Sequence, residues 1–382
     1  MWFLIVTLFP NVGPLGVLTG HAVSIVLYLF LFLRYKVQFP EYFKYLIFGS
    51  LLFASTIVMS QLANYDRLGF GLAQLRYAFV PFYWIFGLLA GVVDAKIFNS
   101  KKRNFFFYFA AIFILAQVPL VLLQVMGFDS LLWIAEKARD WTGILRVVGT
   151  VQNPNTLGII TVLCIVIFAH FSKSKSFWSK VLIGVSVLIV LATGSRTSLI
   201  ILLFLPVIFI SKEQLMSKKL IYALLITIGF LVVFYLVLIY LEEHLPYMSQ
   251  LLNIIRGKSI HTLDTRIGHW ENISELYFSS SFKNILFGFG PGYFTVLDNS
   301  YYYIIFNYGI ASIIVFLFFI SFLFLFGKRQ SSKIPRRCLL VLVISSIVLD
   351  SMISFLFMAI IFYLFGLDSS VYKGKAPIIK NI

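Results

Sequence analysis

A polar segment that could bind phosphate interrupts a long apolar stretch at Thr193-Gly-Ser195-Arg196-Thr-Ser198. The apolar segment that follows begins at residue 197, so Arg196 and the free N–H groups of a helix N-terminus would face the same point. Arginine grips phosphate through a planar fork of donors, and Ser195 could add a hydroxyl. These residues indicate an anion site. The alternative is a tight turn whose arginine reaches back to the membrane surface.

A second polar segment runs from Arg146 through Gly149 to Asn153-Pro154-Asn155. Proline is favoured in the first turn of a helix, so the simplest interpretation is a turn that starts a helix at Pro154. Arg146 and Asn155 could still face one cavity on the same side of the membrane. We therefore keep both residues as candidates for substrate binding.

A third segment, Asp264-Thr-Arg266-Ile-Gly-His269-Trp270-Glu271, combines a cation, possible bases and an aromatic ring on which a sugar could stack. Arg266 could stabilise negative charge, and His269, Trp270 and Glu271 could contact the substrate. The alternative is an ordinary solvated helix. The histidines here lack the spacing to carboxylates or cysteines that a zinc site needs, so the sequence predicts no metal site.

A fourth segment has a glycine-rich turn at Phe287-Gly-Phe-Gly290-Pro-Gly292, followed by Asp298-Asn299 and Tyr301. No Gly-Lys-Ser/Thr follows these glycines, so they predict a tight turn and not a phosphate loop. Asp298 precedes a long apolar run and could cap its helix or act as a general base. His269 and Glu271 are the rival bases, and Asn299 and Tyr301 are candidates for substrate binding.

The elements that must position these segments are membrane-spanning helices. The 382 residues are 60% hydrophobic and only 12% charged, far below the quarter that is usual in soluble domains. A span needs about 20 apolar residues, and the sequence predicts an all-α transmembrane bundle of about 10–12 spans. The apolar stretch 338–367 is too long for one span and contains Asp350, so it predicts two helices that fold back. The candidate spans lie near 1–10, 16–33, 42–60, 74–93, 104–126, 154–171, 177–193, 197–211, 219–241, 300–326 and 338–367.

The distribution of basic residues predicts the orientation of these spans. About two thirds of the 31 lysines and arginines fall in alternate short loops and the C-terminal tail, and this side is expected to be cytoplasmic together with both termini. Most basic residues there are lysines, whereas arginines predominate on the other side, where an anionic ligand would need them. This placement also explains the net charge of +16 without nucleic acid as a partner.

The chain thus divides into N-terminal transmembrane helices (1–241), one large outer loop (242–299) and C-terminal transmembrane helices with a tail (300–382). A second outer segment, 127–153, has apolar residues at helical spacing around Ala138 and Trp141, which predicts a helix lying in the membrane interface. Cys164 and Cys338 fall in apolar runs, so no disulfide is expected.

The four polar segments, in this order, resemble the O-antigen polymerase and O-antigen ligase family of bacterial membrane glycosyltransferases. The resemblance covers about residues 145–320. It rests on an Arg followed by Asn-Pro-Asn, a Ser-Arg turn between spans, and a large loop that opens with Arg and Trp and closes with Gly-Pro-Gly and an acidic or His residue before Asn. The matching residues are Arg146, Asn153, Pro154, Asn155, Ser195, Arg196, Arg266, Trp270, Gly290, Pro291, Gly292, Asp298 and Asn299.

The resemblance implies a metal- and cofactor-independent transfer of a glycan from undecaprenyl diphosphate, at the periplasmic face of the inner membrane. Arg196 and Arg266 would stabilise the leaving diphosphate and Asp298 would be the base. The ligase branch carries His where Asp298 stands, so the resemblance favours a polymerase that adds repeat units of O-antigen or capsule to a lipid-linked acceptor. A ligase that uses lipid A core, and a flippase for lipid-linked sugars, remain alternatives. The family implies membrane lipid and a chain-length regulator protein as partners.

Overall fold

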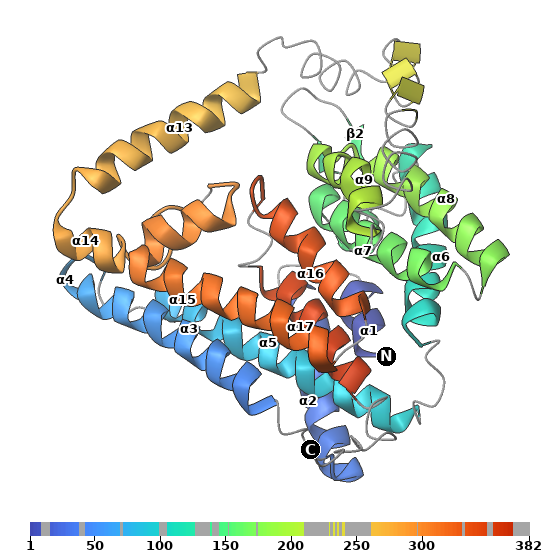
Figure 1. Ribbon diagram of the computed structural model, residues 1–382, viewed down its shortest axis with the longest axis horizontal. Helices are drawn as coiled ribbons and strands as arrows, with labels where there is room; N and C mark the ends of the chain where they lie inside the picture. The colour runs from blue at the N-terminus through green and yellow to red at the C-terminus, as the bar shows by residue number, and fades with distance from the viewer. Residues whose placement is uncertain are drawn as a thin grey trace, which may run out of the picture. The chain divides into compact units, whose positions relative to one another are not determined.

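A computed structural model describes most of the chain (Figure 1). The described residues are 1–8, 16–37, 43–68, 72–98, 105–126, 138–139, 145–151, 153–172, 175–209, scattered positions between 229 and 240, 261–295, 297–330, 333–349 and 354–369. Asp350, the C-terminal tail, and most of the predicted span at 219–241 and of the segment 127–153 lie outside these residues.

The chain forms two compact units. Unit 1 consists of Met1–Phe9, Gly13–Phe113 and His269–Ile382, and unit 2 of Pro10–Val12 and Ile114–Gly268. Two helices, α6 (Phe105–Val125) and α13 (His261–Phe278), have residues in both units.

The helices of unit 1 follow the predicted apolar runs closely. The run 338–367 does form two helices, α16 and α17, because the first helix ends at Ser345 and residues 346–349 form a turn. The elements that lie wholly in this unit are α1 (Trp2–Leu8), α2 (Gly16–Tyr35), α3 (Phe43–Ala63), α4 (Tyr65–Leu68), α5 (Leu72–Ile97), α14 (Phe282–Phe287), α15 (Ser300–Gln330), α16 (Lys333–Ser345) and α17 (Phe355–Ser369).

Unit 2 contains three apolar helices and a short ladder of strands. The helices are α7 (Pro154–Phe171), α8 (Ser176–Thr193) and α9 (Arg196–Phe209), and a 3-10 turn, η2 (Gly149–Val151), precedes α7. The strands β1 (Ala138–Arg139) and β2 (Leu145–Arg146) pair antiparallel, with Ala138 opposite Arg146. The predicted interfacial helix is therefore wrong at Ala138 and Arg139, which bond to a neighbouring strand and not to their own turn.

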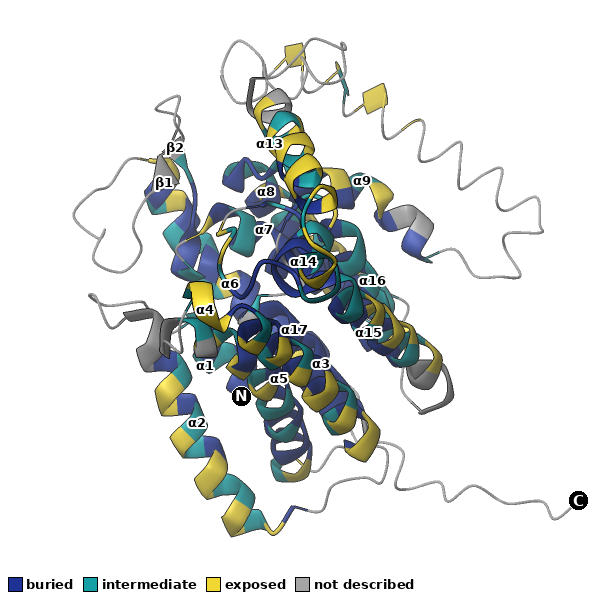
Figure 2. Cartoon of the chain, turned by 90° about the vertical axis from the view of Figure 1, so that its left-hand side faces the viewer, coloured by how far each residue is buried: buried dark blue, intermediate teal, exposed yellow. Residues whose placement is uncertain are grey.

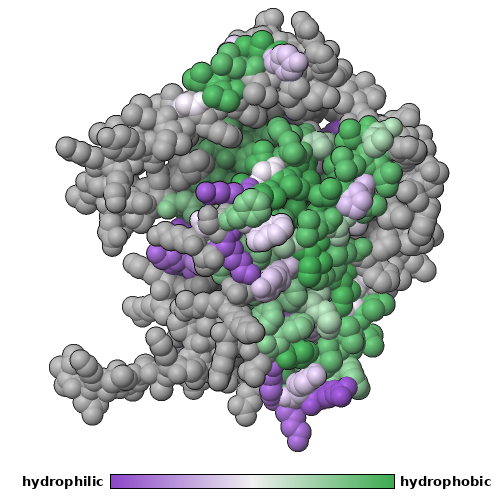
Figure 3. Space-filling view, turned by 90° about the vertical axis from the view of Figure 1, so that its right-hand side faces the viewer, coloured by the Kyte–Doolittle hydropathy of each residue, from purple (hydrophilic) through white to green (hydrophobic). Residues whose placement is uncertain are grey.

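Five described helices are long and apolar enough to cross a membrane, in agreement with the predicted helical membrane protein. These are Phe43–Ala63, Arg76–Ile97, Phe105–Val125, Pro154–Phe171 and Ser300–Leu325. Their outward faces carry large apolar side chains such as Phe48, Leu115 and Phe318, and Figure 3 shows hydrophobic side chains gathered over one broad face. Such a surface suits contact with lipid tails. The full span count and the orientation stay predictions.

The core of unit 1 is the crossing of α5 with α17. Glycines let the two backbones approach closely: a side chain at Gly87 would meet the Ala359 carbonyl, and one at Gly91 the Tyr363 carbonyl. Small residues serve this purpose in membranes, where van der Waals packing takes over from the hydrophobic effect. Figure 2 shows α17 buried along its length, whereas α2 exposes much of its surface.

A kink in α15 positions the glycine-rich turn. Gly309 has φ 84° and ψ 175°, which breaks the helical path. The break releases the carbonyls of Phe306 and Asn307, which accept hydrogen bonds from the N–H groups of Phe289 (2.8 Å) and Gly290 (2.9 Å). The freed carbonyls thus find new partners, as buried backbone groups must. The kink ties the turn at 288–292 to α15.

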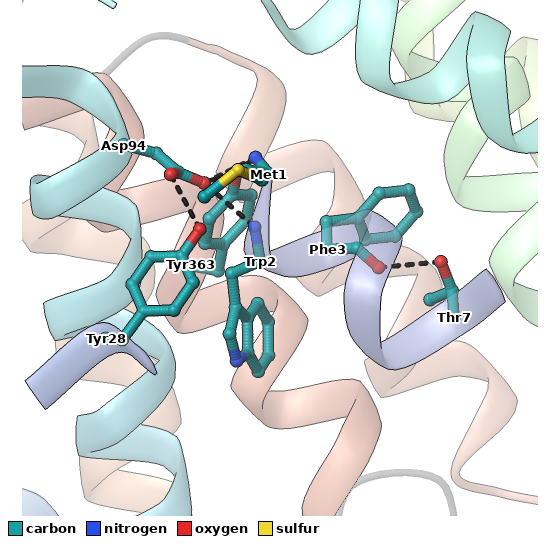
Figure 4. A network of polar contacts seen from close by, with 7 residues as sticks. All are labelled: Met1, Trp2, Phe3, Thr7, Tyr28, Asp94 and Tyr363. Carbon is teal, nitrogen blue, oxygen red and sulfur yellow. Dashed lines mark hydrogen bonds and ion pairs between the residues drawn. The ribbon is translucent and has the colours of Figure 1, made fainter. Parts of the chain in front are cut away.

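A buried carboxylate joins several elements of unit 1 near the C-terminal end of α5. Asp94 is 0% exposed and accepts hydrogen bonds from the Tyr28 hydroxyl (2.7 Å), the Tyr363 hydroxyl (2.8 Å) and the Trp2 N–H (3.0 Å). The Met1 amine also contacts it (Figure 4). One carboxylate therefore links α1, α2, α5 and α17.

We expect Asp94→Ala to lower the stability of the folded chain. Hydrogen bonds between membrane helices average about 0.6 kcal/mol each, so loss of the four contacts predicts about 2–3 kcal/mol. The measurement is thermal unfolding in detergent, followed by tryptophan fluorescence. Ser55→Ala is the control, since the exposed Ser55 hydroxyl bonds only within its own helix, to Leu52 (2.7 Å). Equal melting temperatures for the two variants would contradict the role given to Asp94.

Candidate active site

Arg146 fastens the start of α7 to the end of α8 in unit 2. Its Nη2 donates to Asn155 Oδ1 (3.0 Å) and its Nε donates to the Thr193 carbonyl (3.1 Å). Asn153 caps α7 by accepting from the N–H of Asn155 (2.9 Å), and Pro154 occupies the first turn. The helix start predicted at Pro154 is confirmed, and Arg146 and Asn155 do lie together.

Two glutamines of α6 hold the segment between Arg146 and α7, and the sequence analysis did not single them out. Gln124 Oε1 accepts from the N–H of Val148 (3.1 Å) and of Gly149 (3.0 Å). Gln117 Oε1 accepts from the Thr150 N–H (3.0 Å), and its Nε2 donates to the Thr150 hydroxyl (2.7 Å). The available signal was two amides seven residues apart on one face of an otherwise apolar helix.

The segment 193–198 is a tight turn that presents Arg196 at the start of α9. Gly194 ends α8 in the left-handed region at φ 57°, where glycine is favoured. The Ser195 hydroxyl accepts from the Ser198 N–H (3.3 Å) and from the Ser198 hydroxyl (2.9 Å). Ser195 is fully buried and Arg196 is half-buried. The serines therefore build the turn, and Arg196 supplies its charge.

Close packing beneath this turn fixes its position in unit 2. Gly158 of α7 lies against the side chains of Ser195 and Ser198, and a Cβ at residue 158 would clash with both. Two arginines border this short turn. Arg146 donates a hydrogen bond to the Thr193 carbonyl, and Arg196 follows Thr193 by three residues. Two arginines therefore lie beside the N-terminus of α9, an arrangement that is suited to a phosphate group.

The helix α13 carries the candidates from the third polar segment on different faces. Arg266 and Trp270 are half-buried and stand four residues apart, in line with the buried Ile273 and Tyr277, whereas His269 and Glu271 are exposed. The Trp270 Nε1 donates to the Leu297 carbonyl (2.6 Å), and its ring packs edge-on against Tyr302. Trp270 thus holds the chain next to Asp298.

The C-terminal part of α13 is packed within unit 1. Burial raises the pKa of Tyr277 to about 12, so this phenol stays protonated, and its hydroxyl donates to the Ile285 carbonyl. Ring contacts join Tyr277 to Phe289 and Phe306. This packing links the helix that carries Trp270 to the glycine-rich turn.

Asp298 has a strained backbone and is followed by the true cap of α15. Its φ is 49°, in the left-handed region that non-glycine residues seldom adopt, and its side chain is partly exposed. Asn299 Oδ1 accepts from the N–H groups of Tyr301 (2.9 Å) and Tyr302 (3.0 Å). Asn299 takes the capping role considered for Asp298.

Asn299 and Tyr301 also anchor α15 to α16. The Asn299 Nδ2 donates to the Ile347 carbonyl (2.8 Å), and the Tyr301 hydroxyl donates to the Val343 carbonyl (3.0 Å). The Ser300 N–H adds a bond to the Ser346 carbonyl (2.9 Å). Asn299 and Tyr301, predicted to bind substrate, are engaged in holding Asp298 at this end of unit 1.

Arg67 is a further arginine at this end of unit 1, where α15 begins and α3 ends. Its Nη2 donates to the Phe289 carbonyl and to Asn64 Oδ1, and its guanidinium lies 4.4 Å from the centre of the Tyr293 ring. Asn64 in turn donates to the Gly288 carbonyl (3.0 Å). Sequence reasoning assigns no role to Arg67, whereas the structure uses it to hold the glycine-rich turn.

The structure thus gathers eight of the predicted residues into two sets, one in each unit, and places Arg266, His269 and Glu271 in neither set. Among the described residues, no three His, Cys, Asp or Glu side chains cluster in a way that could hold a metal ion. The set in unit 2 consists of Arg146, Asn155, Ser195 and Arg196, and the set in unit 1 consists of Trp270, Asp298, Asn299 and Tyr301. Comparison with models of protein families, with curated proteins and with solved structures finds no match for this chain.

Proposed function

We propose that this chain is a membrane glycosyltransferase that polymerises polysaccharide repeat units carried on undecaprenyl diphosphate. The observation that carries the proposal is the half-buried Arg196 at the start of α9, beside a turn that Arg146 also binds. A diphosphate leaving group gathers negative charge in the transition state. Fixed guanidinium groups and helix N–H groups stabilise such charge without having to reorganise.

The proposed reaction needs a base for the acceptor hydroxyl. The Asp298 carboxylate would take the hydroxyl proton, the acceptor oxygen would bond to the anomeric carbon of the donor glycan, and the bond from that carbon to the diphosphate would break. The electron pair leaves with undecaprenyl diphosphate, whose charge Arg196, Arg146 and Arg266 would offset. No redox step is involved, and atoms and charge balance without a further reactant.

The structure supports Asp298 over its rivals as the base. His269 and Glu271 are exposed on α13, whereas Asp298 is held from both sides, by Trp270 through Leu297 and by the Asn299 cap. A base must sit in a fixed place within reach of the proton that it removes. Asp298 meets this demand better than an exposed helix side chain does.

The function is tested in bacteria that lack their own polymerase but still make the matching lipid-linked repeat unit. We expect this chain to restore long polysaccharide, seen as a ladder of lengths on a gel, while Lys180→Ala, a change at an exposed lysine of α8, behaves like the parent. Glycan attached to lipid A core without growth in length would instead indicate a ligase. Lipid-linked units that reach the outer face but never lengthen would indicate a flippase.

A further inference from the structure

An aromatic pocket lies in unit 1 between α3, α5 and α15. It has a volume of about 50 Å³. The glycine-rich turn borders it, because a side chain at Gly292 would meet the Tyr77 ring. Its lining residues come from α3, α5 and α15 and are Phe53, Ile57, Tyr77, Val80, Trp84, Tyr303 and Tyr308.

The pocket presents ring faces and not free hydroxyls. The Tyr303 hydroxyl is hydrogen-bonded to those of Tyr77 and Tyr308, and the Tyr77 and Tyr303 rings lie 6.4 Å apart. Hydroxyl groups that bond to one another need no hydrogen bond from a ligand. A hydrocarbon can therefore bind here without leaving a hydroxyl of these three side chains unpaired.

The size of the pocket limits what it can hold. A cavity of about 150 Å³ takes up benzene, so about 50 Å³ is too small for a sugar ring and suits the branch of a hydrocarbon chain. Isoprenoid chains carry methyl branches at regular intervals, whereas common fatty acyl chains are straight. The pocket can therefore hold a methyl branch of an isoprenoid.

A positive charge stands beside Tyr77, one of the residues that line this pocket. Arg76 is exposed at the start of the apolar part of α5, and its Nη2 donates to the Tyr77 hydroxyl (3.1 Å). Its guanidinium lies 5.0 Å from the centre of the Tyr77 ring. A cation beside an apolar pocket complements a molecule with an anionic head and a hydrocarbon tail.

We propose that this pocket binds the head-proximal isoprenoid of the acceptor's carrier lipid, with its phosphate on Arg76. The inference rests on the proposed function, since a polymerase joins two lipid-linked glycans and needs a place for each carrier. The base acts on the acceptor, and Asp298 belongs to the same end of unit 1 as Tyr303 and the Gly292 turn. The arginines of unit 2 are left for the donor diphosphate.

The test is native mass spectrometry of the full chain in detergent, titrated with undecaprenyl phosphate and, separately, with dioleoyl phosphatidylglycerol. Arg76→Ala removes the charge and Val80→Phe fills the pocket. Lys283→Ala and Val26→Phe are the matched controls, since Lys283 is exposed on α14 and Val26 is exposed on α2. We expect two carriers on the parent chain, and binding of one of them weakened by about 10- to 100-fold in Arg76→Ala and Val80→Phe only.

Each other outcome counts against the inference. It is overturned if both pocket variants bind two carriers as the parent does, or if phosphatidylglycerol binds as tightly and responds to the same two changes. If Arg196→Lys stops polymer formation while the pocket variants bind normally, only the inference fails. If the parent chain binds no undecaprenyl phosphate at all, the inference and the proposed function fail together.

Discussion

Replacing Asp298 with asparagine is expected to lower glycan transfer by about 10²- to 10⁴-fold, the usual contribution of a general base. Asparagine has nearly the same shape as aspartate and is among the non-glycine residues that best tolerate a left-handed backbone. The strained φ of 49° at this position can therefore be kept. The change removes the proton acceptor and keeps the shape of the side chain.

The measurement is the rate of polymer formation by the purified chain on lipid-linked repeat units, with melting temperature measured beside it. Glu271→Gln is the matched control: it also neutralises one carboxylate, but on the exposed face of α13. We expect near-parental rates from this control. A full rate in Asp298→Asn, or a large loss in Glu271→Gln, would move the base away from Asp298.

The positions of the helices could be read from the sequence with good accuracy. Apolar runs of span length predicted α3, α6 and α7 to within about three residues, since the bilayer thickness fixes how long such a run must be. Local chemistry added sharp boundaries: Asn153 and Pro154 start α7, and Gly194 ends α8. Signals of this kind depend only on neighbours in the chain.

The sequence failed where structure depends on distant partners. The apolar spacing around Ala138 predicted a helix, but Ala138 pairs with Arg146 in a strand ladder that no local pattern encodes. The run 300–326 was also predicted only as a single span, with no sign of a kink. Its kink at Gly309 exists because the backbone at Leu286 and Gly288 packs against it, where a Cβ would clash.

The candidate site divides in the same way. The contact of Arg146 with Asn155 joins residues nine apart, and their shared polarity beside a helix start already suggested it. The hydrogen bond from Asn299 to the Ile347 carbonyl joins residues 48 apart in the sequence, and the one from Arg67 to the Phe289 carbonyl joins residues 222 apart. Such long-range contacts determine which polar residues of the site have a structural role, and a single sequence does not reveal them.

Arg196→Lys is expected to reduce polymer formation by at least about tenfold, and Arg196→Ala by about 10²- to 10³-fold, as when a transition-state donor is removed. Lysine keeps the charge but loses the planar fork that binds phosphate at two points. The turn itself should survive, because Thr193, Ser195 and Ser198 supply its hydrogen bonds. The substitutions thus separate phosphate binding from folding.

Arg146 provides the contrast that makes this test specific. Its side chain bonds to Asn155 and to the Thr193 carbonyl, so Arg146→Lys should lower the melting temperature as well as the rate. For Arg196→Lys we expect a loss of rate that is far larger than any loss of folded protein at the assay temperature, with Lys180→Ala parental in both. If Arg196→Lys melts early and its remaining folded fraction turns over at the parental rate, Arg196 is a structural residue, and the diphosphate must be bound elsewhere.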